Sequence, residues 1–233
     1  MIINTSAVVL KTFSYGETSL ISRCFTKKRG KISFIIKGAK SKKNLTAPYF
    51  QPLSHINVIY NENEKKELQI ISKVHFINIW LKISESLKKM TLLQSILEMT
   101  DFSLEVNDPH PILFDSLVDI INSYEDDSIN PNVAFWLYET IILSEMGFRI
   151  DLEPENFSIK DCNSPFLKMG KEQSIEIMKH LINGRFENIS FDNISVEDKR
   201  LISNYLYGQL CYHIDGFDRL KSFRIAKNIL IDL

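Results

Sequence analysis

The stretch Lys31-Ile32-Ser33-Phe34-Ile35-Ile36-Lys37 decides the first half of the fold. Ile32, Phe34 and Ile36 alternate with the remaining residues, and this period of two is typical of a strand that buries one face. The strand is therefore expected to present Lys31, Ser33 and Lys37 on its outward face.

Four other stretches are rich in Val, Ile, Thr and Phe, and they complete a set of five predicted strands: Thr5–Phe13, Thr18–Phe25, Pro52–Tyr60 and Leu68–Phe76. Turn residues separate the strands, and one long basic connection follows residue 37. Five short strands within about 75 residues predict a small barrel such as the oligonucleotide-binding (OB) fold.

From about Ser84 the spacing of apolar residues changes to the 3.6-residue period of a helix. Helices are predicted near residues 87–98, 109–121, 133–146, 171–183, 195–213 and 218–230. Residues 150–170 break the pattern and are predicted to form a small hairpin. The fold class is therefore α+β with two domains, an OB-fold domain over residues 1–81 and an all-helical domain over residues 82–233.

Basic residues gather at the N-terminal end of the chain. The first 50 residues carry ten basic side chains against Glu17 alone, although the whole chain has a net charge of −1. Residues 18–61 contain nine basic residues and no acidic one, and these nine form the candidate DNA-binding set: Arg23, Lys27, Lys28, Arg29, Lys31, Lys37, Lys40, Lys42 and Lys43.

A lysine-dense block on an otherwise acidic protein is typical of a surface that binds a polyanion, because phosphate contacts release condensed counterions. A solvated basic face with no ligand is the alternative. The block shows no pattern of side chains that reads base edges, so binding is expected to be weakly sequence-specific. Tyr15, Tyr49 and Phe50 lie in predicted connections, where an exposed ring can stack on a base.

Other classes of protein find little support. No apolar run is long enough to span a bilayer, and the N-terminus lacks the pattern of a signal peptide. Three well-separated cysteines indicate reduced thiols in a cytosolic protein. No cofactor or metal is expected, and no catalytic motif occurs. A hydrolase or transferase that uses Glu17 or Ser19 is the weakest hypothesis.

Segments at both ends of the chain are familiar from one known family: Ala7–Lys11, Tyr15–Leu20, Phe25-Thr26, Gly30-Lys31, Ile35–Lys42, Leu53, Tyr212–Phe217 and Leu220–Ser222. In these segments the chain resembles the bacterial recombination mediator family RecO. It implies an OB-fold domain joined to a helical domain that often carries a cysteine zinc motif. Here the segment Phe157–Met169 contains only Cys162, so the chain departs from the family at that motif and metal is not expected.

The resemblance also implies a non-catalytic function at the nucleoid, in the cytoplasm. It implies binding of single- and double-stranded DNA, annealing of complementary strands, and assistance in loading RecA onto strands coated by single-strand-binding protein. The implied protein partners are RecR and the C-terminal tail of single-strand-binding protein. An alternative hypothesis is a protein-interaction adaptor whose basic face binds the acidic tail of another protein rather than DNA.

Overall fold

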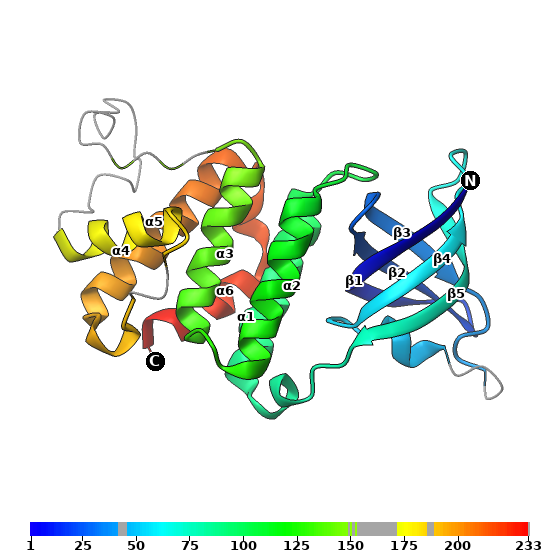
Figure 1. The fold of residues 1–233 in the computed structure, drawn as a ribbon, viewed down its shortest axis with the longest axis horizontal. Helices are drawn as coiled ribbons and strands as arrows, with labels where there is room; N and C mark the ends of the chain where they lie inside the picture. The colour runs from blue at the N-terminus through cyan, green and yellow to red at the C-terminus, as the bar shows by residue number, and fades with distance from the viewer. Residues whose placement is uncertain (42–45, 149, 151, 153–171, 186–188, 233) are drawn as a thin grey trace. The chain divides into compact units, whose positions relative to one another are not determined.

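The computed structural model describes residues 1–233 except 42–45, 149, 151, 153–171, 186–188 and 233 (Figure 1). Two compact units make up the chain. The first contains Met1–Leu81 and Thr100–Val118, and the second contains Lys82–Met99 and Asp119–Leu233. The predicted division into domains 1–81 and 82–233 stays a proposal. In the structure, residues 100–118 belong to the first unit.

The first unit contains the predicted five-stranded barrel. Its strands are β1 (Ile2–Tyr15), β2 (Ser19–Thr26), β3 (Gly30–Ile36), β4 (His55–Asn61) and β5 (Leu68–Asn78). They close in the order β1-β2-β3-β5-β4, with β3 and β5 parallel and all other neighbours antiparallel (Figure 1). The prediction of a small closed barrel is confirmed.

The length of β1 closes the barrel. Its first half, Ile2–Val8, pairs with β4, and its second half, Ala7–Tyr15, pairs with β2. A β-bulge between Val9 and Lys11 lies where the strand turns from one partner to the other. Such a bulge increases the local twist, which lets one strand pair with two neighbours across a closed sheet.

The barrel core consists of the inward-facing side chains of all five strands. Ile32, Phe34 and Ile36 are buried there, as their alternation predicts. The ring of Phe34 lies 5.1 Å from that of Tyr60 in an edge-to-face arrangement. Burial of apolar area at about 25 cal/mol per Å² is the main source of stability for so small a core.

A short 3-10 helix, η1 (Ala47–Phe50), adds to this core and corrects one expectation. Phe50 is buried in the core, so it is not the exposed stacking ring that its place in a connection suggests. Tyr49 is half-buried and stacks on Phe76 of β5, with 4.4 Å between ring centroids. Only Tyr15 of the three expected surface rings is well exposed.

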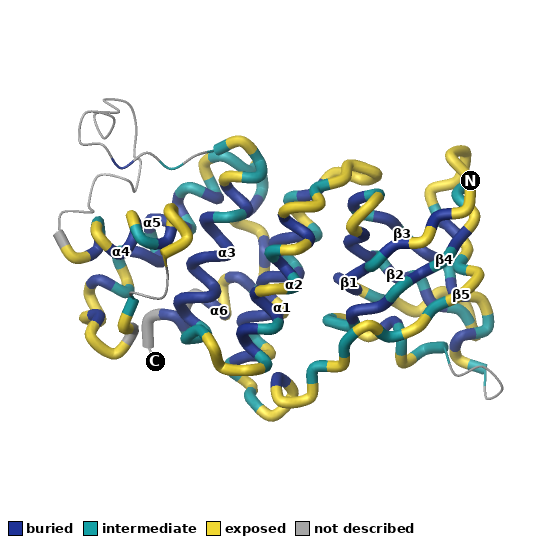
Figure 2. Tube along the Cα trace, viewed as in Figure 1, coloured by how far each residue is buried: buried dark blue, intermediate teal, exposed yellow. Residues whose placement is uncertain are grey.

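The second unit is helical. Its elements are η2 (Lys82–Glu85), α1 (Leu87–Ser103), α2 (Pro111–Asp126), α3 (Pro131–Glu145), α4 (Glu172–Ile182), η5 (Phe191–Asn193), α5 (Val196–His213), η6 (Phe217–Arg219) and α6 (Lys221–Asp232). The end of α1 and the start of α2 lie within residues 100–118 and so belong to the first unit. Figure 2 shows α3 buried along most of its length, in agreement with its nearly continuous apolar sequence. None of the helices in the described part of the chain is long and apolar enough to cross a membrane.

Helix boundaries follow local capping groups. The Asn130 side chain accepts a hydrogen bond from the backbone N–H of Asn132, and Ser195 caps α5 in the same way through Asp198. The last predicted helix, 218–230, is wrong at its start, because Leu220 is extended and separates η6 from α6. The predicted hairpin at residues 150–170 and Cys162 lie outside the described residues.

Candidate nucleic-acid interface

The structure describes seven of the nine predicted basic residues, and these seven fall into two groups. Four of them form ion pairs with carboxylates of the first unit: Arg23, Lys27, Arg29 and Lys31. Of the others, Lys28, Lys37 and Lys40 are exposed, while Lys42 and Lys43 lie outside the described residues. The charge block is therefore not one continuous open surface.

Asp101, near the end of α1, holds two of the paired residues. Arg23 Nη1 donates to both of its carboxylate oxygens, at 3.0 and 2.7 Å. Lys31 Nζ donates to the Asp101 backbone carbonyl at 2.5 Å and lies 3.9 Å from Oδ1. Burial lowers the pKa of Lys31, and the nearby Asp101 carboxylate offsets part of this shift by favouring the charged amine.

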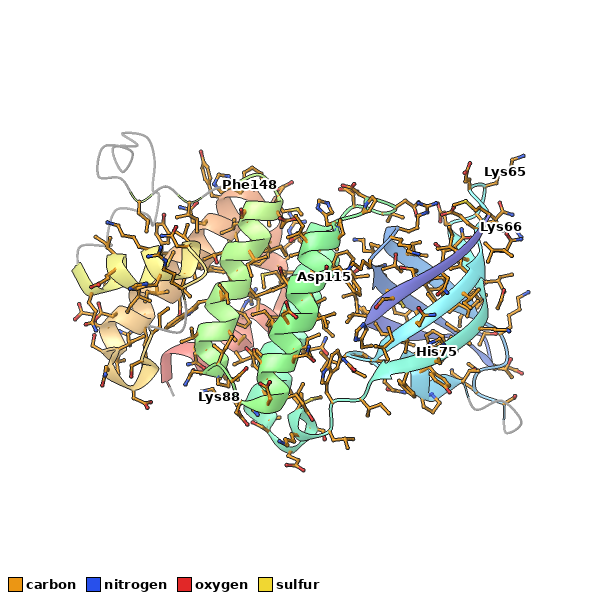
Figure 3. All side chains as sticks on the ribbon, viewed as in Figure 1. Lys65, Lys66, His75, Lys88, Asp115 and Phe148 are labelled. Atoms are coloured by element: carbon orange, nitrogen blue, oxygen red, sulfur yellow. The ribbon has the colours of Figure 1, made fainter. Side chains whose placement is uncertain are left out.

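The other two pairs differ in exposure. Arg29 donates through Nε and Nη2 to the two Glu62 oxygens, at 2.9 and 3.3 Å, and these hydrogen bonds raise the pKa of Arg29. Lys27 Nζ lies 2.7 Å from Asp115 Oδ1, and about half of each side chain is exposed. Figure 3 shows Asp115 on α2. An ion pair this open contributes little to stability.

The outward face of β3 differs from the open row of lysines that the alternation predicts. Lys31 does point away from the barrel core, but the side chain is only 11% exposed because the end of α1 covers it. Lys37 is exposed but follows the strand, which ends at Ile36. The prediction of solvent-facing charge along this strand is therefore wrong for Lys31.

The sequence of residues 100–118 indicates that this segment can pair with the basic block. The segment carries four acidic residues, Asp101, Glu105, Asp108 and Asp115, and no Lys or Arg. An acidic segment of this kind is a candidate partner for a basic block elsewhere in the chain. The pairing itself joins residues about 80 positions apart, which no local pattern specifies.

A further feature favours anion binding, and sequence analysis missed it. None of the five strands contains an aspartate or a glutamate. Lys11 of β1 and Lys73 and His75 of β5 are exposed, in addition to Lys27, Lys28, Lys37 and Lys40 of the predicted set. Figure 3 labels His75 on β5. The strands therefore contribute positive but no negative side chains to the barrel surface, which favours an anionic ligand.

The β4–β5 connection extends this surface with mixed charge. Lys65 and Lys66 are exposed and project from the connection, as Figure 3 shows. Glu64 and Glu67 flank them and are exposed too. This connection is the second of the two loops that border the ligand face of OB folds.

Groups of the kinds that take part in catalysis or metal binding have structural roles in the barrel or lie exposed at its surface. Cys24 is fully buried, and burial raises its pKa to about 12, which leaves the thiol protonated and unreactive. Glu17 is exposed in the turn between β1 and β2, and Ser19 pairs with Tyr15 in the barrel. Within the described residues, no three His, Cys, Asp or Glu side chains are grouped to hold a metal ion.

Comparison with known families accounts for both units. The family model described as "Recombination protein O N terminal" matches residues 1–80. The model described as "Recombination protein O C terminal" matches residues 84–222. Together the two matches cover the barrel and nearly all of the helical part of the chain.

Curated relatives agree with these matches. The chain is 24% identical to "DNA repair protein RecO" of Flavobacterium psychrophilum, over 98% of this chain and 99% of the relative. It is also 24% identical to the protein of the same name from Flavobacterium johnsoniae, with the same coverage. A Salinibacter ruber protein of that name is 33% identical, over 48% of this chain and 44% of the relative.

Proposed function

This chain belongs to the recombination protein O family, and from that premise we propose that it binds single- and double-stranded DNA as a non-catalytic mediator of DNA repair and recombination. The observation that carries the proposal is the barrel surface, whose strands contain no acidic residue and are bordered by exposed lysines. Lysines on such a surface attract the phosphate backbone whatever the base sequence.

The proposed phosphate contacts come from Lys28, in the turn between β2 and β3, and from the basic residues that follow β3 in the chain: Lys37, Lys40, Lys42 and Lys43. Arg23, Arg29 and Lys31 are proposed to stabilise the first unit instead, because DNA would have to displace a protein carboxylate to reach them. Lys27 has the most exposed of the ion pairs, so it remains available to exchange Asp115 for a phosphate.

Family membership supports the finer parts of the proposal. We propose that the protein anneals complementary strands and assists the loading of RecA onto strands coated by single-strand-binding protein. RecR and the tail of single-strand-binding protein are its proposed protein partners. The proposed place of action is the nucleoid in the cytoplasm.

One observation favours the adaptor alternative. Four basic side chains of the block already form ion pairs with three protein carboxylates, those of Asp101, Glu62 and Asp115. The same surface is therefore chemically able to accept an acidic peptide from another protein. The two functions make different demands, because a phosphate backbone supplies charge at regular spacing over a long strand and an acidic tail does not.

Fluorescence anisotropy with a labelled single strand and a labelled duplex tests the proposal. Both DNAs are expected to bind, with an affinity that falls linearly with the logarithm of salt concentration, and an unlabelled acidic peptide is expected to compete weakly. Mixing complementary strands with the protein should accelerate duplex formation. Lack of binding to either DNA at low salt, together with tight binding of the acidic peptide, would establish the adaptor alternative.

A further inference from the structure

We infer that apolar side chains across the outside of the barrel hold the bases of a single strand, an inference that rests on the proposed function and locates the bases within it. Phe13 of β1 is paired with Ile21 of β2, and Ile21 is paired with Ile35 of β3. Ile35 in turn is paired with Ile70 of β5. These four residues, named here the outer apolar row, run side by side across four neighbouring strands.

The four side chains of the outer apolar row point away from the barrel core. Successive residues of a strand face opposite sides of a sheet. Leu20, Phe34 and Ile36, which adjoin Ile21 and Ile35 in sequence, are buried in the core. The row itself is 37% exposed at Phe13 and 49% exposed at Ile70, while Ile21 and Ile35 are half-buried.

A continuous apolar row on the outside of a barrel is unusual, because outward positions of a small barrel ordinarily carry polar side chains. The strands of a sheet are about 4.8 Å apart, so the three steps between four strands span roughly 14 Å. The outer apolar row is therefore long enough to contact a ligand over several strands. A ligand with apolar surface of its own would remove these side chains from water.

Basic side chains lie beside the outer apolar row. Lys11 Nζ lies 6.0 Å from the centroid of the Phe13 ring, within reach of a cation–π interaction. At the other side, the backbone N–H of Lys40 donates to the Thr18 carbonyl, so the turn after β3 lies beside the turn between β1 and β2. Lys37 and Lys40 of that turn are both exposed. Glu17 is the acidic residue of the β1–β2 turn, and it lies outside the strands.

The combination fits a single strand of DNA better than it fits other partners. An unpaired strand offers the flat faces of its bases next to its phosphates, and it can place the first on the apolar row and the second on the lysines. A duplex hides its base faces by stacking, so it can use the lysines but not the row. An apolar protein segment would cover the row but would bring no anionic group to the exposed Lys11 and Lys40.

The test separates bases from phosphates. A thymidine oligonucleotide and an abasic strand of the same length carry the same phosphates, and anisotropy titrations measure the affinity of the intact protein for each. We expect the wild-type protein to prefer the thymidine strand by about ten-fold, because its bases can stack on the outer apolar row and the abasic strand has none to stack. The Phe13→Ala/Ile70→Ala variant is expected to lose most of this preference while its affinity for the abasic strand stays within about two-fold.

A matched control removes apolar surface from the same two strands outside the row. Ile2 of β1 and Ile77 of β5 are exposed, and the Ile2→Ala/Ile77→Ala variant is expected to keep the wild-type preference. Equal affinity of the wild-type protein for the two strands, or an unchanged preference in the Phe13→Ala/Ile70→Ala variant, would overturn the inference and leave DNA binding itself intact. Failure to bind either strand would overturn the proposed function, and this inference with it.

Discussion

Single carboxylates decide which basic residues of this protein remain open to a ligand. Asp101 neutralises Arg23 and covers Lys31, and Glu62 holds Arg29 through two hydrogen bonds. The basic residues were evident from the sequence, but their partners were not, because the paired residues lie far apart along the chain. The sequence therefore predicted which side chains carry charge and not which of them present it to solvent.

Replacing Asp101 should destabilise the first unit. The Asp101→Asn variant loses the ion pair with Arg23. It also removes from the largely buried Lys31 the stronger of its two carboxylate interactions, those with Asp101 and Glu105, so we expect a loss of about 2 kcal/mol in the free energy of unfolding. Urea denaturation followed by circular dichroism measures it. Asp115→Asn is the matched control, because its pair with Lys27 is exposed and should contribute less than about 1 kcal/mol. Equal losses in the two variants would show that Asp101 does not stabilise the first unit more than Asp115 does.

His55 links the stability of the barrel to pH. Burial lowers its pKa from 6.5 to about 4. Asn78 Nδ2 lies 3.4 Å from the ring nitrogen Nδ1 and can donate to it, which leaves Nε2 to donate to Ser6 Oγ at 2.7 Å. The ring also stacks on Trp80, with 5.6 Å between centroids. These contacts fit a neutral imidazole and oppose its protonation.

The pH dependence follows from the two pKa values. The unfolded chain protonates His55 near pH 6.5 and the folded protein only near pH 4, so stability falls as the pH drops from about 6.5 towards 4. Between pH 7.5 and pH 5 the loss due to His55 should be about 2 kcal/mol. Urea denaturation at both pH values, on the wild type and His55→Gln, isolates this part, since other groups titrate in both proteins. An identical pH dependence in the variant would show that His55 does not contribute.

At the scale of elements, the turn between β2 and β3 ties the barrel to residues 100–118. Gly30 has a φ of +65°, and a Cβ there would lie 1.9 Å from the Asp108 carbonyl oxygen. The Lys31 carbonyl accepts a hydrogen bond from the backbone N–H of Asn107, and Phe25 packs edge-to-face on Phe114, with 5.4 Å between centroids. The need for a glycine in this turn was predictable, whereas the close approach of a second segment was not.

Substitution of two glycines measures how closely residues 100–118 pack on the turn between β2 and β3. Gly16, in the turn between β1 and β2, also has a positive φ, but it has no neighbour within 4 Å of its Cβ position. Gly16→Ala should cost about 1–2 kcal/mol for backbone strain alone. Gly30→Ala should cost roughly 3 kcal/mol or more, because the Asp108 backbone must also move. Similar losses of unfolding free energy in urea would indicate that residues 100–118 do not pack on this turn.

The elements themselves were largely predictable, because each has a clear period and clear ends. The strands agree with the alternation to within a few residues, and β1 exceeds its predicted range because it pairs with two different strands. The outer apolar row was not predictable. Ile21, Ile35 and Ile70 gain their common role only from the register of four strands, which sequence spacing does not specify.

At the scale of the whole molecule, charge is divided between its parts. Residues 1–81 carry thirteen basic and four acidic side chains, whereas the chain as a whole is slightly acidic. We propose that the barrel surface and the basic residues after β3 bind nucleic acid, and that the helical second unit takes no part in phosphate binding. This division of roles is our central claim.

The salt dependence of single-strand binding tests that claim most directly. Each phosphate contact contributes about 0.7 to the slope of log affinity against log salt. Replacing Lys40, Lys42 and Lys43 with alanine should weaken binding to all sequences alike and reduce the slope by about two. The control variant removes three positive charges from the helical unit, those of Lys179, Lys199 and Arg200, and should keep the wild-type slope. An unchanged slope in the loop variant, or an equal reduction in the control, would contradict the account.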